Sequence, residues 1–308
     1  MALPTKTQGE SLAVTATTRT SVASRLMPIW RAMRQDPRWW SGVVLLIFVL
    51  AALFAPFVSP YSPTLYHPAI AEQGPSLAHP LGTDSLGRDQ LSRIIFGARI
   101  SLSVGVVSIL FGGICGAILG IIGAYSKGWV DQLITIIVDA LLSFPSLVLA
   151  LAMIAALGPS IANLVVALAV VRIPIYARIA RGQTLQVVEQ GYVEAAHVAG
   201  TRSWKILYRH VFPNIFSPLL VQATVSIALA MIDESVLSFL GLGVQPPTPD
   251  WGAMISDAQQ YLSSDPWMML GPALAMVIVL VSLNLFGDAV RDRLDPRDMA
   301  RMVAPLES

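Results

Sequence analysis

A polar stretch in the second half of the chain decides how the rest is interpreted. It reads Tyr192-Val193-Glu194-Ala195-Ala196-His197-Val198-Ala199-Gly200 and runs on to His210-Val211-Phe212-Pro213, with long apolar runs on both sides. Glycine has no Cβ and bends the backbone at little steric cost. We therefore predict two short helices separated at Gly200, and a new element that starts at Pro213.

The composition indicates a polytopic membrane protein. Of the 308 residues, 55% are hydrophobic and 13% are charged, proportions that a water-soluble domain of this size does not show. The formal net charge of +1 favours neither a nucleic acid nor a bulk anionic partner. Cys115 is the only cysteine, so the chain cannot form an internal disulfide bond.

Six apolar runs are candidates for membrane spans, because roughly 20 apolar residues cross a bilayer core. They cover residues 39–58 and, approximately, 100–124, 133–157, 161–180, 213–240 and 267–285. We therefore predict an all-α membrane protein with six transmembrane helices. The first run is longer than the core of a secretory signal peptide, which is the rival interpretation of that segment. In the second run Gly112, Gly116 and Gly120 fall on one helix face, a spacing that lets two membrane helices pack closely.

Lysine and arginine are concentrated in the loops of one side, which sets the orientation. If the termini lie inside, the inside loops carry most of the cations: Lys6, Arg19, Arg25, Arg31, Arg34, Arg38, Lys127, Arg172, Arg178, Arg181, Arg202, Lys205, Arg209, Arg291, Arg293, Arg297 and Arg301. The outside loops keep Arg88 and Arg93, with Arg99 at a boundary. The positive-inside rule therefore places both termini and the stretch around Glu194 in the cytoplasm.

This orientation divides the chain into parts. We predict a cytoplasmic tail over residues 1–38, a first span with an outer loop over 39–98, a transmembrane core over 99–289, and a second cytoplasmic tail over 290–308. The core contains a cytoplasmic loop over residues 182–212. In the outer loop we predict a tight turn, with Asp84 or Ser85 as the N-cap of a helix that contains Arg93.

Acidic residues in the spans are the candidates for a translocation path. Charged side chains in hydrocarbon cost about 2.5 to 3.5 kcal/mol each on insertion scales, so they normally face a bundle interior or a watery cavity. Asp233 and Glu234 are neighbours late in the fifth run, about 100° apart around a helix, so we expect them to meet different partners. One interpretation has Glu234 lining the outer mouth of a path, with Asp139 as a second polar group. The other leaves Asp233 and Glu234 in the membrane interface beside the outer loop.

Common enzyme signatures are missing from the sequence. A phosphate-binding loop needs Gly-Lys followed by Ser or Thr, and none of the three lysines follows a glycine. The His-Glu-x-x-His and Gly-x-Ser-x-Gly signatures are also absent. The four histidines, His67, His79, His197 and His210, are divided between two loops on opposite sides, which argues against a single metal site. We therefore expect neither an enzyme nor a metal or cofactor bound by this chain.

The stretch around Glu194 resembles the Glu-Ala-Ala loop of the integral-membrane subunits of ABC importers. Gly200 follows the triplet after three residues, and nine further residues lead to a group that ends in Pro213. His210 departs from the common form of that group. In this family the loop forms coupling helices that dock onto a separate ATPase. The resemblance implies an ATPase-coupling role for Glu194, Ala195, Ala196, Gly200, Arg202 and Pro213.

Other segments closely resemble the second permease of dipeptide, oligopeptide and nickel ABC importers. They are residues 79–89, 233–254, 284–288 and 291–296, with Ser235 where the family commonly has alanine. The resemblance implies a type I importer permease in a bacterial inner membrane, paired with a second, non-identical permease. It further implies an external solute-binding protein and two ATPases, which would bind ATP and magnesium.

The substrate implied by the resemblance is a di- or oligopeptide, and nickel or another metal chelate is the alternative. The sequence has no cluster of His or Cys that would hold a bare ion. A secondary transporter would show internal repeats with broken helices, and none is visible. A purely structural membrane protein would leave Asp139, Asp233 and Glu234 without a role. The accepted peptide length, the identity of the two ATPases and the role of residues 1–38 stay open.

Overall fold

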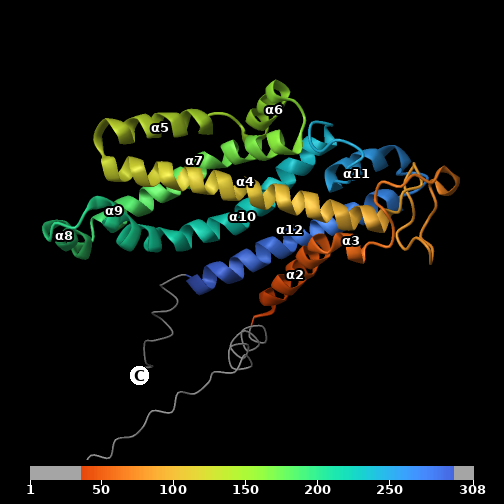
Figure 1. Ribbon diagram of the computed structural model, residues 1–308, viewed down its shortest axis with the longest axis horizontal. Helices are drawn as coiled ribbons and strands as arrows, with labels where there is room; N and C mark the ends of the chain where they lie inside the picture. Colours follow the sequence, from red (N-terminus) through yellow and green to blue (C-terminus); the bar gives the residue numbers. More distant parts are fainter. Residues whose placement is uncertain (1–35, 295–308) are drawn as a thin grey trace, which may run out of the picture. The chain divides into compact units, whose positions relative to one another are not determined.

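The computed structural model describes residues 36–294, and long helices that run alongside one another dominate it (Figure 1). In chain order its elements are η1 (Pro37–Trp39), α2 (Trp40–Leu53), α3 (Ala55–Val58), η2 (Pro68–Ile70), α4 (Gln90–Ser126), α5 (Gly128–Leu142), α6 (Ser146–Leu157), α7 (Ile161–Val188), α8 (Gly191–Val198), α9 (Ser203–Ile206), η3 (Leu207–Val211), α10 (Phe212–Phe239), α11 (Trp251–Ala258), η4 (Gln259–Tyr261) and α12 (Trp267–Leu294). Within these residues there is no β-strand, and an isolated bridge joins Thr83 to Asp89. The all-α prediction is confirmed.

Four helices are long and apolar enough to cross a membrane. They are α4, α7, the continuous helix Ser203–Phe239 and α12. α5 and α6 meet the same test together, but they are bent by 90° at the break between them. Pro145 is the N-cap residue of α6, and proline has no backbone N–H with which to continue the hydrogen bonds of α5. The third predicted run is therefore two helices rather than one straight span.

The first predicted run is also interrupted. α2 ends at Leu53, and α3 begins at Ala55 after the single residue Phe54. Pro56 lies in the first turn of α3, and its missing N–H prevents α2 from running through this point. Both predicted tails lie largely outside the described residues, although α12 continues as far as Leu294.

The contact between α4 and α7 depends on the predicted glycine face. A Cβ added at Gly112, Gly116 or Gly120 would lie 2.5, 2.4 or 2.2 Å from a backbone carbonyl oxygen of α7. These oxygens belong to Ala169, Ile173 and Ala177. Only residues without a Cβ let two helix backbones approach so closely, so the prediction that these glycines serve helix packing is confirmed.

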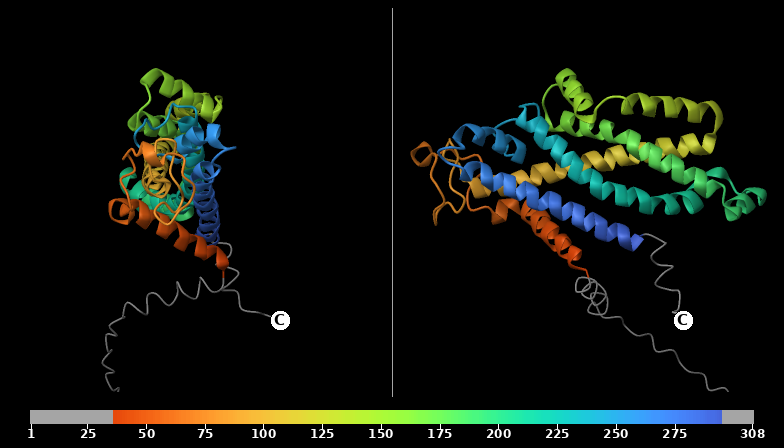
Figure 2. Two further views of the ribbon diagram at one scale, coloured as in Figure 1. Left: turned by 90° about the vertical axis from the view of Figure 1, so that its right-hand side faces the viewer. Right: turned by 180° about the vertical axis from the view of Figure 1, so that it is seen from behind.

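Trp251 packs α11 against the end of the helices at which α4 begins. Its side chain is fully buried, and its indole Nε1 donates a hydrogen bond of 3.0 Å to the carbonyl oxygen of Ile94 in α4. Phe48 of α2 meets the same ring edge-on, with ring centroids 6.2 Å apart. α11 and the loop before α4 lie at one end of the helices, and α8 and α9 lie at the other (Figures 1 and 2).

The loop before α4 contains the predicted turn, but the helix cap is a different residue. Asp84 closes the turn by accepting hydrogen bonds of 2.9 Å from the backbone N–H groups of Leu86 and Arg88. Asp89 is the N-cap of α4, where its Oδ2 accepts from the backbone N–H of Ser92 at 2.8 Å. The prediction of Asp84 or Ser85 as the cap was wrong, because the turn delays the start of the helix.

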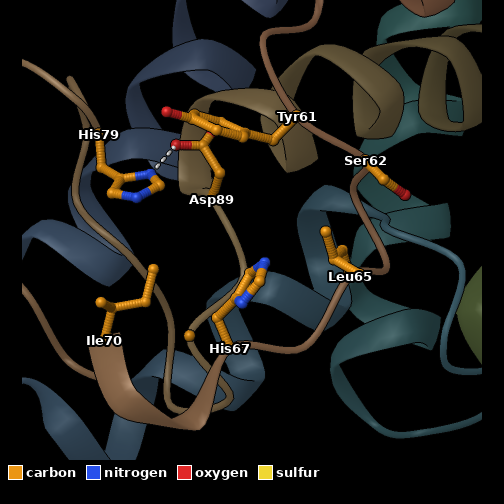
Figure 3. A pocket seen from close by; sticks show the side chains of 8 residues that line it. Tyr61, Ser62, Leu65, His67, Ile70, His79 and Asp89 are labelled. Atoms are coloured by element: carbon orange, nitrogen blue, oxygen red, sulfur yellow. Dashed lines mark hydrogen bonds and ion pairs between the residues drawn. The ribbon is translucent and has the colours of Figure 1, made fainter.

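Asp89 also contributes to a small cavity beside the turn. Its Oδ1 lies 2.8 Å from Nδ1 of His79, and the ring of His79 lies next to that of Tyr61, with centroids 4.8 Å apart (Figure 3). The cavity has a volume of about 120 Å³, and His67 lies on another wall. The cap of α4 is thus tied to the preceding loop by a carboxylate–imidazole contact.

Candidate coupling site and charged residues of the spans

α8 ends in a glycine motif that separates it from α9. Gly200 has φ +73°, and its N–H donates to the carbonyl oxygen of His197 at 2.9 Å. The N–H of Thr201 donates to the carbonyl oxygen of Ala196 at 3.1 Å. This pair of bonds is the Schellman motif, in which glycine takes the left-handed position. The predicted break at Gly200 is confirmed, but the second helix is not short, because α9 continues through η3 into α10 as one helix from Ser203 to Phe239.

The predicted start of a new element at Pro213 is not a break in the structure, because the helix from Ser203 to Phe239 runs through this residue. α10 begins at Phe212, and Pro213 occupies its first turn, where a missing N–H costs no intrahelical bond. No loop precedes it, because the π-helical turn η3 joins α9 to α10. π turns of this kind are often found at functional sites.

Small and polar side chains form part of the exposed surface of α8. Glu194 and Ala195 are exposed and Ala196 is half-buried, whereas Val193 is fully buried and anchors the helix. Arg202, the N-cap residue of α9, is exposed as well. The residues predicted for coupling therefore gather on one accessible segment of the chain.

Large apolar side chains beside these residues escaped the sequence analysis. Val198, Trp204 and Tyr208 are 85%, 64% and 73% exposed. Trp204 and Tyr208 are four residues apart, so they fall on the same side of the helix that continues into α10. Aromatic side chains in a polar stretch at this spacing were the available signal, since exposed aromatic residues often anchor a protein partner.

Two contacts between tyrosine and histidine hold α8 against its neighbours. The hydroxyl of Tyr125 in α4 and Nε2 of His197 share a hydrogen bond of 3.2 Å, and the two rings are stacked with centroids 6.1 Å apart. The rings of Tyr192 and His210 lie 5.6 Å apart. The amide of Asn214 donates to the Tyr192 hydroxyl at 3.4 Å and to the His210 carbonyl oxygen at 2.6 Å.

The acidic residues of the spans meet arginines of α7. Asp233 in α10 forms a largely buried ion pair with Arg172, and Asp139 in α5 pairs with Arg178 at 2.7 Å. Asp131, which the sequence analysis did not single out, binds Arg181 through both carboxylate oxygens at 2.6 and 2.7 Å. The sequence signal that could have predicted these ion pairs is the presence of Arg172, Arg178 and Arg181 in one helix, α7.

Glu234 is enclosed by its own subunit. Its side chain is fully buried, and the hydroxyl groups of Ser235 and Ser238 each donate to its carboxyl oxygens at 3.2 Å. The expectation that Asp233 and Glu234 meet different partners is confirmed. A place for Asp139, Asp233 or Glu234 on a solute path stays a prediction.

Polar cavities lie along the half of the helices nearer α8. One of about 160 Å³ is lined by Asp139, Arg178 and Arg181 between α5 and α7. A larger groove of about 720 Å³ lies between α7, α10 and α12 and is lined by Gln183, Asn214, Ser217, Gln222, Asp288 and Arg291, among others. Across residues 36–294, no group of three or more His, Cys, Asp or Glu side chains is arranged to hold a metal ion.

Comparison with known families gives two matches on separate parts of the chain. The family described as "Binding-protein-dependent transport system inner membrane component" matches residues 112–298. The "N-terminal TM domain of oligopeptide transport permease C" matches residues 25–80. Together they cover the first span and most of the core.

Several curated proteins are similar over most of their length. The dipeptide transport system permease protein DppC of Alkalihalophilus pseudofirmus is 40% identical over 83% of this chain and 84% of its own. The glutathione transport system permease protein GsiD of Pectobacterium atrosepticum is 40% identical over 90% and 93%. The di/tripeptide transport system permease protein DppC of Pseudomonas aeruginosa is 40% identical over 89% and 93%.

Solved structures show the same fold at low identity. The inward-facing MetNI methionine ABC transporter superposes with a TM-score of 0.56 at 19% identity, over 67% of this chain and 97% of that one. An amino acid ABC transporter with histidines gives a TM-score of 0.53 at 16% identity, over 66% and 94%.

Proposed function

Because the chain belongs to the family of binding-protein-dependent transport system inner membrane components, we propose that it is the permease through which a bacterial importer passes di- or oligopeptides. The family makes it a multi-pass inner-membrane subunit of a transporter. The names of the curated relatives support a peptide substrate, because they specify transport of dipeptides, of di- and tripeptides, and of glutathione. None of these names favours the nickel alternative.

The proposed complex contains this chain, a second homologous permease, two ATPases and an external solute-binding protein. ATP and magnesium would bind on the ATPases. The observation that carries this proposal is the exposed segment from Glu194 to Tyr208, which combines small side chains on α8 with exposed apolar groups. Small residues let a partner approach the helix closely, and Val198, Trp204 and Tyr208 supply apolar area for it to bury.

Gly200 gives a direct test of ATPase coupling. Valine is strongly disfavoured at φ +73°, so Gly200→Val should misplace α9 relative to α8. Glu194→Lys reverses an exposed charge on the same segment. We expect both variants to insert in the membrane but to lose co-purifying ATPases and peptide uptake. Gly191→Ala is the matched control, because Gly191 has no atom within 4 Å of an added Cβ and does not need a left-handed backbone. Wild-type assembly and uptake in both variants would refute the coupling role.

Asp139 is the predicted path residue that this structure leaves most open. Its side chain is 54% exposed and its partner Arg178 is 65% exposed, beside a polar cavity. We propose that this pair meets the solute, whereas Asp233 is held by Arg172 and Glu234 would be reached only if α10 and α11 part. Asp139→Asn should reduce uptake while the ATPases stay bound, and an unchanged uptake rate would remove Asp139 from the path.

The orientation of the chain is proposed from the distribution of its cations. With both termini in the cytoplasm, a reporter that is active only outside the inner membrane should be active when fused after Pro75 or Asp257. It should be silent when fused after Arg202 or after Arg297, which lies outside the described residues. One reversed result would overturn the orientation.

A further inference from the structure

α8 is joined to its neighbours at a few places, and a single pair of side chains joins it to α4. Two residues separate the end of α7 from the start of α8. In the last turn of α8, His197 contacts Tyr125 of α4. α4 itself has little freedom to slide along α7, because the two helices pack closely through Gly112, Gly116 and Gly120.

Removing the contact with α4 would leave the last turn of α8 free to pivot about its first turn. The linker between α7 and α8 has no side-chain bond to α4, and α8 contributes only one fully buried residue, Val193. The ring contact between Tyr192 and His210 ties the first turn of α8 to η3, which leads into α10. His197 lies in the last turn, so the bond to Tyr125 fixes the end of α8 that leads into Gly200 and α9.

Tyr125 also sits at a particular place in α4. It belongs to the last turn of a helix of 37 residues, which is about 55 Å long at 1.5 Å per residue. At the other end of the same helix, Asp89 caps the first turn, and Ile94 in the second turn accepts a hydrogen bond from Trp251. One helix therefore connects the segment proposed to bind the ATPases with the buried network at the outer end.

We propose that Tyr125 is a positioning residue that transmits the movement of α8 to α4 through His197. This inference rests on the proposed coupling role of α8, and it concerns transmission rather than binding of the ATPases. The contact is exposed, so its net contribution is that of one ordinary hydrogen bond with ring stacking. Losing it changes the population of the aligned position of α8 by about threefold to tenfold.

The test uses the assembled complex of both permeases, the ATPases and the binding protein in lipid vesicles. We compare Tyr125→Phe, which removes the hydroxyl and keeps the ring, with His197→Leu and with the double variant. Peptide taken up per ATP hydrolysed should fall about threefold to tenfold in each single variant. The double variant should be no worse than the more damaged single one, because both changes remove the same interaction.

Two controls separate positioning from a general structural effect. Tyr261→Phe makes the same chemical change in η4, and Tyr261 has no bond to α8; it should leave the ratio unchanged. His197→Gln keeps a side chain that can donate and accept a hydrogen bond, and it should recover part of what His197→Leu loses. Equal ratios in the Gln and Leu variants, or a wild-type ratio in Tyr125→Phe, would overturn the proposal.

The outcome can be told apart from failure of the coupling role itself. We expect the ATPases to co-purify fully with Tyr125→Phe. Their loss would make Tyr125 part of the docking surface and would overturn the proposed transmission of movement. Assembly that survives Glu194→Lys and Gly200→Val would instead refute the coupling role of α8, independently of the result for Tyr125.

If Tyr125→Phe inserts poorly, a Tyr125→Cys/His197→Cys pair in a Cys115→Ala background replaces it. A short bifunctional maleimide should link the two positions, and the absence of a link would overturn the proposal.

Discussion

The packing of α4 against α7 predicts a sharp penalty for adding one methyl group at Gly116. The new Cβ would lie 2.4 Å from the carbonyl oxygen of Ile173 and 2.7 Å from Cβ of Tyr176, whereas ordinary contacts begin at 3.4 Å. The two helices would have to separate by about 1 Å, and overpacking of this kind costs about 1 to 3 kcal/mol. Backbone atoms form part of the obstacle, so a change of rotamer cannot relieve it.

A matched variant isolates this penalty from helix propensity. Replacing glycine by alanine inside a helix is favourable by about 1 kcal/mol on its own, which would mask part of the clash in Gly116→Ala. Gly182 lies in α7 with no atom within 4 Å of an added Cβ, so Gly182→Ala gains the propensity without a clash. The difference in unfolding free energy between the two variants should therefore be about 1 to 3 kcal/mol.

Reversible unfolding of the purified subunit by sodium dodecyl sulfate in mixed micelles measures this difference. We expect Gly182→Ala to resist the detergent at least as well as the wild type, and Gly116→Ala to unfold at a lower detergent fraction. The reasoning would fail if Gly116→Ala proved as stable as Gly182→Ala, since α4 and α7 would then not be in close backbone contact.

Two other predictions concern charged residues at different depths. Arg172→Leu or Asp233→Leu alone should destabilise the subunit by about 3 to 5 kcal/mol, because the remaining buried charge loses its partner, and the double variant should recover part of this loss in the same unfolding assay. On α11, partial desolvation raises the pKa of Asp257 although the residue is exposed, and Asp84 adds to the increase while Arg93 and Arg88 oppose it. The stabilisation from the protonated carboxyl group is therefore present below the ordinary pKa of aspartate and is lost as pH rises through the raised value. Thermal midpoints measured at a series of pH values should fall over this range in the wild type, and Asp257→Asn should remove the fall. Parallel curves for the wild type and Asp257→Asn would contradict the assignment.

The elements that local chemistry controls were predictable from the sequence. The glycine face of α4 and the break at Gly200 follow from the one residue without a Cβ, and both were found where the sequence placed them. The bend between α5 and α6 was missed although Pro145 marks it. A count of apolar residues gives the length of a run but does not show whether the run is straight. The sequence analysis therefore included Pro145 within a single predicted span.

The partners of the charged residues could not be predicted in the same way. Asp131 and Arg181 are far apart in the sequence, and their bond depends on how α5 folds back along α7. The contact between Tyr125 and His197 has the same origin, because it joins the end of α4 to a helix that follows α7. Sequence spacing identifies faces of one helix, whereas contacts between helices require the tertiary arrangement.

The arginines of α7 refine the argument for orientation. The sequence analysis counted Arg172, Arg178 and Arg181 as cations of a cytoplasmic loop, but α7 continues to Val188 and all three lie within it. Each of them is paired with an aspartate of α5 or α10. They therefore contribute to contacts between helices and should not be counted as loop cations in the positive-inside rule. The loop cations that remain between α7 and α10 are Arg202, Lys205 and Arg209, all exposed. On the other side Arg88 and Arg93 are buried against Asp84, and the boundary residue Arg99 is exposed. Exposed lysines and arginines are therefore still more numerous near α8 and α9 than at the opposite end, even when Arg172, Arg178 and Arg181 are left out. The proposed cytoplasmic position of α8 and α9 depends on these exposed cations.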